Sequence, residues 1–106
     1  VHNDLPTNDW NTLARNLSSP DSYLAKVPQA RSLFAPRGFF EQVTMPASIT
    51  LGTSGSAAHW LSRQPPDLDM PRSLYRSDAP PPGLAKILKQ SADDWHTFLA
   101  ARADEL

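Results

Sequence analysis

The chain has 106 residues, of which 40% are hydrophobic, and its formal net charge is −1 at pH 7. This length and composition suit one small domain, and the lack of a basic excess excludes typical nucleic-acid binding and attachment to anionic membranes. No run approaches the roughly 20 apolar residues of a membrane span. Cysteine is absent, which excludes disulfides and thiolate metal sites and favours a reducing compartment, so we expect a cytoplasmic protein.

The first residues have the pattern of a buried strand that ends at a turn. Asn3-Asp4-Leu5-Pro6 is such a turn, although no strand-forming run precedes it. Thr7 can cap a helix over residues 7–18, where apolar residues recur at helical spacing. A short helical turn is expected over residues 23–26, before Pro28, and residues 27–46 are predicted to be irregular but partly buried.

A strand, a flexible loop and a helix are predicted next. Residues 48–51 are rich in β-forming side chains, residues 52–56 are small and polar, and residues 57–61 favour a helical turn. Six of the eleven prolines fall within residues 65–82, which predicts a loop there.

The clearest element is a helix over residues 83–106, which carries an apolar face at helical spacing. That face is formed by Leu84, Ile87, Leu88, Ser91, Trp95, Phe98, Leu99, Arg102 and Leu106. Asp93 and Asp94 are predicted to lie on the solvated side, with Trp95 and Phe98 as core beneath them.

The order strand, helix, strand, helix is typical of α/β folds with a parallel sheet. Two short strands cannot form such a sheet alone, so further strands are expected outside this sequence. We therefore expect an incomplete parallel sheet with flanking helices, and we interpret residues 1–106 as an internal fragment of one domain.

Functional groups in open α/β sheets lie just past the carboxyl ends of the strands, which indicates two positions here. At the first, Asp4 can accept the two hydroxyls of a ribose, or it is a solvated turn acid. At the second, Trp60 offers an indole N–H donor on an apolar plane, or it is a core aromatic with His59 as a surface neighbour. The residue types leave these alternatives open.

Sharper motifs are mostly absent from the loop at residues 52–56. It lacks the Gly-Lys pair of a P-loop and the G-x-G-x-x-G dinucleotide fingerprint, so a phosphate cradle is a weak alternative. A serine hydrolase using Ser54 or Ser56 with His59 would need Gly-x-Ser-x-Gly, which is not present. The three histidines have no ligand spacing, and no structural metal is predicted. A non-catalytic α/β binding or interaction domain remains the main alternative to an enzyme.

Four blocks, in chain order, resemble one known family. "HNDLPTNDWNTL" is similar to the Asn-Asp-Leu-Pro-x-Asn-Asp-Phe-Asn signature of the SABATH carboxyl methyltransferases, which depend on S-adenosylmethionine. "APRGFFEQ" resembles their Val-Pro-Gly-Ser-Phe-Tyr-Gly-Arg stretch, and "MPASITLGTSGSAAHWLS" resembles their strand and loop ending in Ser-x-His/Met-Trp-Leu-Ser. "GLAKILKQSADDWHTFLAARADEL" is similar to their long helix ending in Phe-Leu-x-x-Arg-x-Glu-Glu-Leu.

The resemblance implies a class I methyltransferase, a Rossmann-like fold with a helical cap, and S-adenosylmethionine as cofactor. It implies that Asp4 and Leu5 contact the adenosine end, with Asp4 on the ribose, and that Gly38 and Phe39 lie beside the adenine. The glycine-rich loop for the methionine end would precede this segment, and further strands and most of the cap would follow it.

The resemblance also implies that Trp60 donates its indole N–H to the substrate carboxylate and that His59 lines the same pocket. Gly38 stands where the family has serine, and Ser56 stands where it has tyrosine, so the pocket wall is smaller and more polar. We therefore expect a microbial or fungal relative acting on a small carboxylic acid other than a plant-type aromatic acid. Neither nucleic acid nor a membrane is expected as a partner, and a homodimer is left open.

Overall fold

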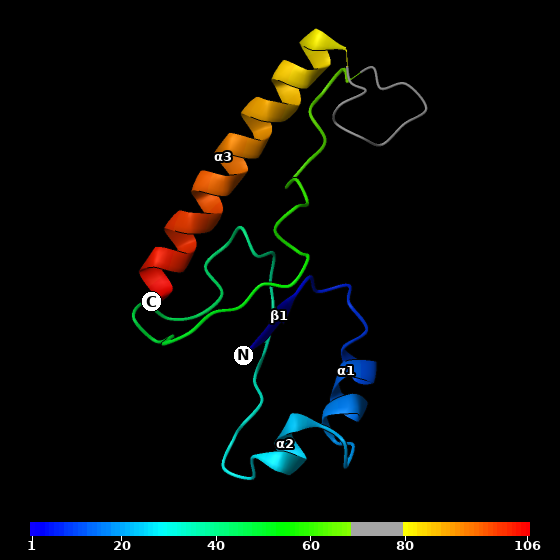
Figure 1. Cartoon of the computed structure of the whole chain (residues 1–106), viewed down its shortest axis with the longest axis vertical. Coiled ribbons are helices and arrows are strands. Elements are labelled where there is room, and N and C mark those ends of the chain that lie inside the picture. Colours follow the sequence, from blue (N-terminus) through cyan, green and yellow to red (C-terminus); the bar gives the residue numbers. More distant parts are fainter. Residues whose placement is uncertain (69–79) are drawn as a thin grey trace.

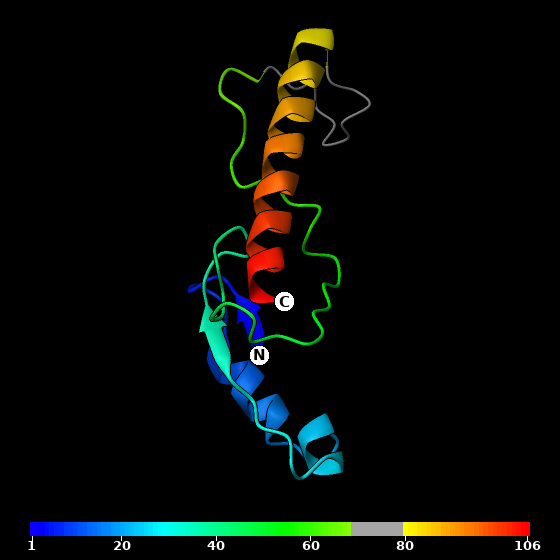
Figure 2. The same cartoon turned by 90° about the vertical axis from the view of Figure 1, so that its left-hand side faces the viewer.

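The structure is a computed structural model that describes residues 1–68 and 80–106. Its elements follow the order β1 (His2–Asp4), α1 (Trp10–Leu17), α2 (Tyr23–Lys26), β2 (Phe34–Pro36) and α3 (Pro81–Glu105). The two strands and the two short helices form one end of the molecule, and α3 extends away with its C-terminal end nearest the strands (Figures 1 and 2).

The strands β1 and β2 form a parallel pair in which His2 lies opposite Phe34 and Asp4 lies opposite Pro36. The side-chain amide of Asn3 strengthens this pair, since its Nδ2 donates to the carbonyls of Ala35 at 2.9 Å and Arg37 at 2.8 Å. Helices α1 and α2 lie in the connection between the strands, as parallel pairing requires. The prediction of an α/β arrangement with parallel strands is therefore confirmed.

Helix α1 begins at Trp10 rather than at residue 7, because Asp9 and not Thr7 caps it. The Asp9 carboxylate accepts from the backbone N–H of Thr12 at 2.9 Å and from its hydroxyl at 2.6 Å. Residues 5–8 form a preceding turn, closed by a hydrogen bond from Asn8 N to Leu5 O. The short helix α2 spans Tyr23–Lys26, as predicted.

The second strand of the pair lies in the segment predicted to be irregular, and the strand predicted at residues 48–51 is wrong. The backbone N–H groups of Ser48 and Ile49 instead donate to the carbonyl of Glu105, each at 2.9 Å, and that of Ala47 donates to Asp104. These donors satisfy carbonyls at the C-terminus of α3, which have no partner within the helix.

The helix predicted to start at residue 57 is also wrong, because only one turn forms there. That turn is closed by a bond from Trp60 N to Ala57 O at 3.1 Å. It does not continue, since the backbone N–H of Ser62 donates to the Asp94 carboxylate on α3 instead of to a carbonyl in its own segment. Ser56 precedes the turn with φ 61°, in the left-handed region.

The long C-terminal helix is confirmed, and it starts within the predicted proline-rich loop. Pro81 and Pro82 occupy the first turn of α3, where the missing N–H groups need no helical partner. The middle of the predicted loop, residues 69–79, lies outside the described residues.

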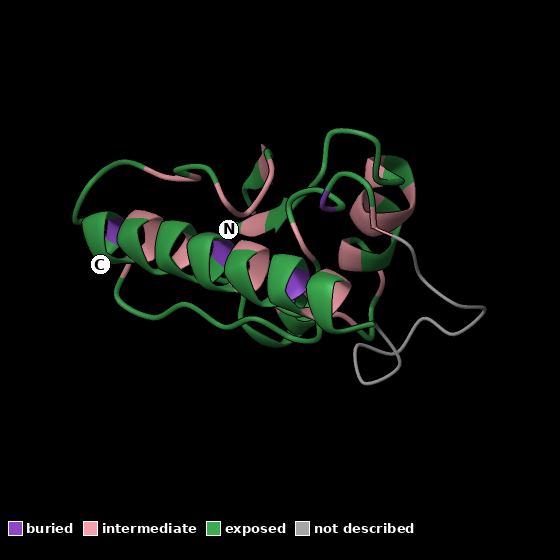
Figure 3. Cartoon of the chain, turned by 90° about the horizontal axis from the view of Figure 1, so that it is seen from above, coloured by how far each residue is buried: buried purple, intermediate pink, exposed green. Residues whose placement is uncertain are grey.

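The inward face of α3 differs from the predicted apolar face by a small rotation. Its buried positions are Ile87, Asp94 and Glu105, and they recur along one side of the helix (Figure 3). Asp94 is only 7% exposed, whereas Trp95 is 51% exposed, so the assignment of Asp94 to solvent and of Trp95 to the core is wrong.

The chain buries little apolar surface of its own. In the described part, Ile87 and Pro65 are the buried non-polar residues, and the radius of gyration is 17.4 Å. A compact domain of this length would have a radius of gyration of about 13 Å. The loops between β2 and α3 are therefore not fixed by a large core, and their polar contacts with α3 are what hold them in place.

Candidate cofactor and substrate site

A cleft of about 1020 Å³ brings together five of the six side chains predicted for the site: Asp4, Leu5, Gly38, Phe39 and Trp60. Its size is at the upper end of the range of about 300–1000 Å³ for small-molecule sites. The cleft lies at the carboxyl ends of both strands, since β1 ends at Asp4 and β2 ends opposite it at Pro36. This is the position where open α/β sheets bind ligands.

The two segments predicted to hold the cofactor lie side by side at the wall of this cleft, because each follows one of the two paired strands. Asp4 is exposed, and its Oδ1 accepts from the backbone N–H of Leu5 at 2.7 Å. A Cβ atom on Gly38 would lie 3.9 Å from Cδ2 of Leu5 and 3.3 Å from Oε1 of Glu41. The cleft thus offers a carboxylate acceptor beside an apolar wall, and these groups fit the hydroxyls of a ribose and the face of a base.

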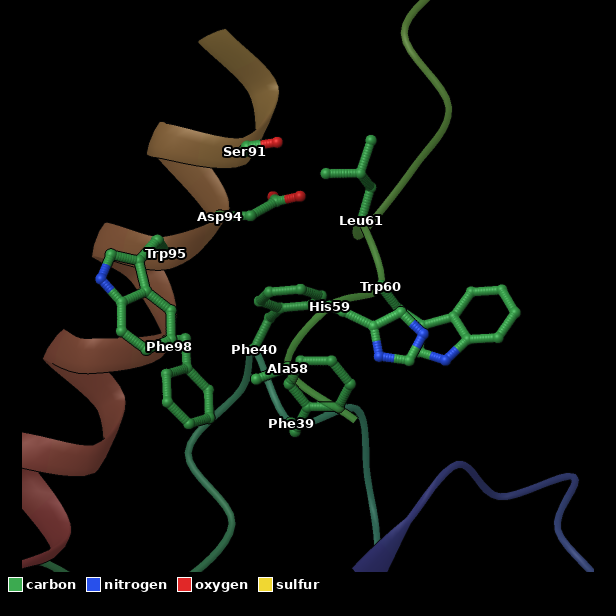
Figure 4. A pocket seen from close by; sticks show the side chains of 10 residues that line it. All are labelled: Phe39, Phe40, Ala58, His59, Trp60, Leu61, Ser91, Asp94, Trp95 and Phe98. Atoms are coloured by element: carbon green, nitrogen blue, oxygen red, sulfur yellow. The ribbon is translucent and has the colours of Figure 1, made fainter. Parts of the chain in front are cut away.

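The sixth predicted residue, His59, lies in an adjoining pocket of about 170 Å³ with a mostly aromatic wall (Figure 4). Phe39 and Trp60 line both cavities, so the two lie next to each other. The rings of His59 and Trp60 lie 5.5 Å apart at 31°. Trp60 is 68% exposed in this chain, so its indole is accessible from the two cavities.

Asp94 connects α3 to the segment that carries Trp60, and its side chain points from the helix toward that segment (Figure 4). Its carboxylate accepts from Ser62 N at 2.8 Å, from Ser62 Oγ at 2.7 Å and from Gln90 Nε2 at 2.8 Å. Burial raises the pKa of Asp94, but these hydrogen bonds, with the charge of Arg63, outweigh it and leave the pKa below its usual value. The group is an anion at neutral pH.

Arg102 and Glu105 connect the end of α3 to the segment that carries Phe39. Arg102 donates to the carbonyls of Phe39 at 2.6 Å and Glu41 at 2.8 Å, and to both oxygens of Glu105 at 2.7 Å. Glu105 also accepts from the backbone N–H groups of Val43 and Thr44. The Arg102 hydrogen bonds lower the pKa of Glu105; burial opposes this, and the two backbone donors add to the lowering.

The sequence interpretation missed these charged contacts because it placed acidic side chains in solvent. A usable signal was present, since Asp94 lies seven residues after Ile87 and Glu105 lies seven residues after Phe98. Residues at this spacing share a helix face, so both carboxylates fall on the face of the apolar residues.

The hydrolase alternative gains no support from the geometry. Across residues 1–68 and 80–106, no hydrogen bond joins His59 to Ser54 or Ser56, and the two serines line the larger cleft without His59. The same residues contain no group of three or more histidine or acidic side chains suited to a metal ion. No helix in the described part has the length and apolar character to cross a bilayer.

The structure is that of an α/β protein with a cleft of small-molecule size at the ends of two parallel strands. Residues 1–106 match the model of the family described as SAM dependent carboxyl methyltransferase. The chain belongs to this family, and the resemblance to the SABATH enzymes is confirmed.

Curated relatives agree with this assignment. The chain is 32% identical over 109 residues to a salicylate/benzoate carboxyl methyltransferase of Arabidopsis thaliana and 33% identical over 114 residues to a probable caffeine synthase 4 of Camellia sinensis. It is 33% identical over 109 residues to methyltransferase LUC1 of a Fusarium species. These matches cover 98%, 98% and 100% of the chain but only 28%, 31% and 27% of the relatives.

Proposed function

We propose that the protein transfers the methyl group of S-adenosylmethionine to the carboxylate of a small acid, and that its complete fold is of the class I, Rossmann-like type. Membership of the carboxyl methyltransferase family supports the activity. The observation that carries the site is the convergence of Asp4, Leu5, Gly38 and Phe39 on one cleft at the ends of two parallel strands. The crossover through α1 and α2 supports the fold.

Four residues of this chain would hold the adenosine part of the cofactor. The Asp4 carboxylate accepts hydrogen bonds from ribose hydroxyls, and Leu5 and Phe39 provide apolar surface for the base. Gly38 leaves room beside Leu5, since a Cβ atom added there would have only the flexible end of Glu41 as close as 3.3 Å. S-adenosylmethionine, when bound, supplies an electrophilic methyl group on a sulfonium.

Trp60 and His59 would face the acid. A carboxylic acid with a pKa of about 4 is ionised at neutral pH, so no residue needs to act as general base. The remaining task is to orient the carboxylate and exclude water, which an indole N–H on an apolar plane can do. The names of relatives include salicylate/benzoate, farnesoic acid and caffeine, so acceptors differ within the family and the particular acid is not assigned.

The test is calorimetric titration of S-adenosylhomocysteine into the complete protein, followed by methyl transfer to a panel of small acids. Asp4→Ala should weaken binding by about 1.5–3 kcal/mol, or roughly ten- to a hundredfold, because charged hydrogen bonds to the ribose are lost. Asp21→Ala, which changes an exposed acid outside the cleft, should leave affinity unchanged. Unchanged affinity in Asp4→Ala would refute the ribose assignment, and binding without turnover on any acid would favour a non-catalytic binding domain.

A further inference from the structure

The two loops that line the cleft are attached to α3 by buried or half-buried charged side chains. We propose that α3 positions both halves of the site: Asp94 holds the loop of His59 and Trp60, and the Arg102–Glu105 pair holds the loop of Gly38 and Phe39. We call these contacts the substrate-loop clamp and the cofactor-loop clamp. The names of the loops rest on the proposed function, whereas the anchoring itself does not.

The substrate-loop clamp acts two residues after Trp60. Ser62 gives both its backbone N–H and its hydroxyl to Asp94, and Gln90 holds the same carboxylate from one turn earlier on α3. The turn that contains Trp60 has its own bond to Ala57, which is local and does not fix the turn relative to the helix. The direction in which the exposed indole enters the cleft therefore depends on Asp94.

The cofactor-loop clamp contacts the backbone of Phe39 directly and its ring through Phe98. The guanidinium of Arg102 reaches the carbonyls of Phe39 and Glu41, and it lies 5.3 Å from the centre of the Phe98 ring. Phe98 in turn meets Phe39 edge to face at 6.0 Å. Glu105 fixes the guanidinium and binds the backbone of Val43, so the loop is attached at both ends of this short segment.

The two clamps share one helix face but are separate units. Asp94 and Glu105 are eleven residues apart, which corresponds to about 16 Å along the axis and a rotation within about 20° of the same direction. Both carboxylates therefore lie on the side of α3 that faces the two cavities: Asp94 lines the smaller pocket and Glu105 lines the cleft. Their partners do not overlap, so removing one clamp should leave the other intact.

Asp94, Arg102 and Glu105 are positioning residues on this interpretation, because they reach the ligand only through the loops. Asp94→Asn should lower kcat/KM for the acid about ten- to a hundredfold, since a displaced loop misaligns the reacting groups. The dissociation constant of S-adenosylhomocysteine should stay within about twofold, as expected for independent sites. Glu105→Gln should have the opposite selectivity: it should weaken the binding of S-adenosylhomocysteine about tenfold and change the KM for the acid less.

The experiment compares these variants with matched neighbours in the complete protein. Asp93→Asn changes an exposed acid that pairs with Lys89 on the helix surface, and Asp104→Asn changes an exposed acid next to Glu105. Both variants should leave kcat/KM for the acid and the dissociation constant of S-adenosylhomocysteine unchanged. Hydrogen–deuterium exchange gives a readout without activity: Asp94→Asn should accelerate exchange in residues 57–63, and Glu105→Gln should accelerate it in residues 39–44.

Ser62→Ala removes one donor of the substrate-loop clamp and replaces Asp94→Asn in the test if that variant does not fold. It should lower kcat/KM for the acid by less than Asp94→Asn does. Equal loss of cofactor and acid affinity in both variants, or exchange that increases uniformly, would overturn the proposal. If the wild-type protein neither binds S-adenosylhomocysteine nor methylates an acid, the proposed function fails. In that case the hydrogen–deuterium exchange of the two variants still tests whether α3 anchors the two loops.

Discussion

Replacement of Glu105 by glutamine should cost the protein stability at neutral pH but not at acidic pH. The Glu105 side chain is 6% exposed and accepts two hydrogen bonds from Arg102 and two from backbone N–H groups. Glutamine keeps the shape and one oxygen but loses the charge and one acceptor. Hydrogen bonds to a charged group contribute about 1.5–3 kcal/mol each and do not add fully, so we expect a loss of about 2–3 kcal/mol.

The pH dependence follows from the direction of the pKa shift. Because the pKa of Glu105 is lowered in the folded protein, the unfolded chain takes up the proton first as the pH falls. The stabilisation by the carboxylate is complete above the unfolded pKa of about 4.3, and it is lost as the pH falls through the folded value. Protonated glutamate resembles glutamine, so the difference between the wild type and Glu105→Gln should vanish there.

Urea unfolding of the complete protein at neutral pH and at an acidic pH below the folded pKa of Glu105 measures both free energies. Asp104→Asn is the control, since the Asp104 side chain is exposed and should contribute little at either pH. A difference of equal size at both pH values, or an equal loss in Asp104→Asn, would refute a role for the buried charge.

Three further outcomes are expected. Gly38→Ser should leave the free energy of unfolding within about 0.5 kcal/mol, because the new Cβ comes closer than ordinary contact only to the flexible end of Glu41, and it should tighten S-adenosylhomocysteine binding in calorimetry; a folding defect would contradict this geometry. Asp9→Ala should accelerate amide exchange at Thr12 while Asp21→Ala does not, because only Asp9 caps α1; equal rates would show that the cap is dispensable. Trp60→Phe should raise KM for the acid or lower kcat with cofactor affinity kept, and a large loss of cofactor affinity would contradict its assignment to the acid.

Local patterns sufficed to predict the three helices that form within residues 1–68 and 80–106, but they also predicted one at residues 57–61 that stops after a single turn. Non-local partners decided the strands. The 25 residues of α3 carry enough helical periodicity to be recognised, and α2 is bounded by a serine cap and a proline. The strand β2 has only three residues and one of them is proline, so it is defined by its pairing with β1. Residues 48–51 have strand propensity, but the backbone N–H groups of Ser48 and Ile49 donate to the carbonyl of Glu105 at the end of α3.

The candidate site also has a part that could be predicted from the sequence and a part that depends on remote partners. Asp4 and Trp60 were indicated by their places after predicted strands, the roles of all six residues came from the resemblance, and the structure brings the six to two adjoining cavities. The clamps could not be predicted because their partners are remote in sequence: Ser62 lies 32 residues from Asp94, and Val43 lies 62 residues from Glu105. A carboxylate is buried only where such donors meet it, and the sequence near Asp94 or Glu105 does not show them.

The shared face of the two carboxylates on α3 places a constraint on length as well as on residue type. One residue inserted between Asp94 and Glu105 would turn the second carboxylate by about 100° and move it by about 1.5 Å, away from the Phe39 loop. Exposed positions between them, such as His96 and Ala100, can vary without this effect. In proteins that keep both clamps, insertions and deletions should therefore be confined to the loops, and this part of the helix should keep its residue count even where its sequence diverges.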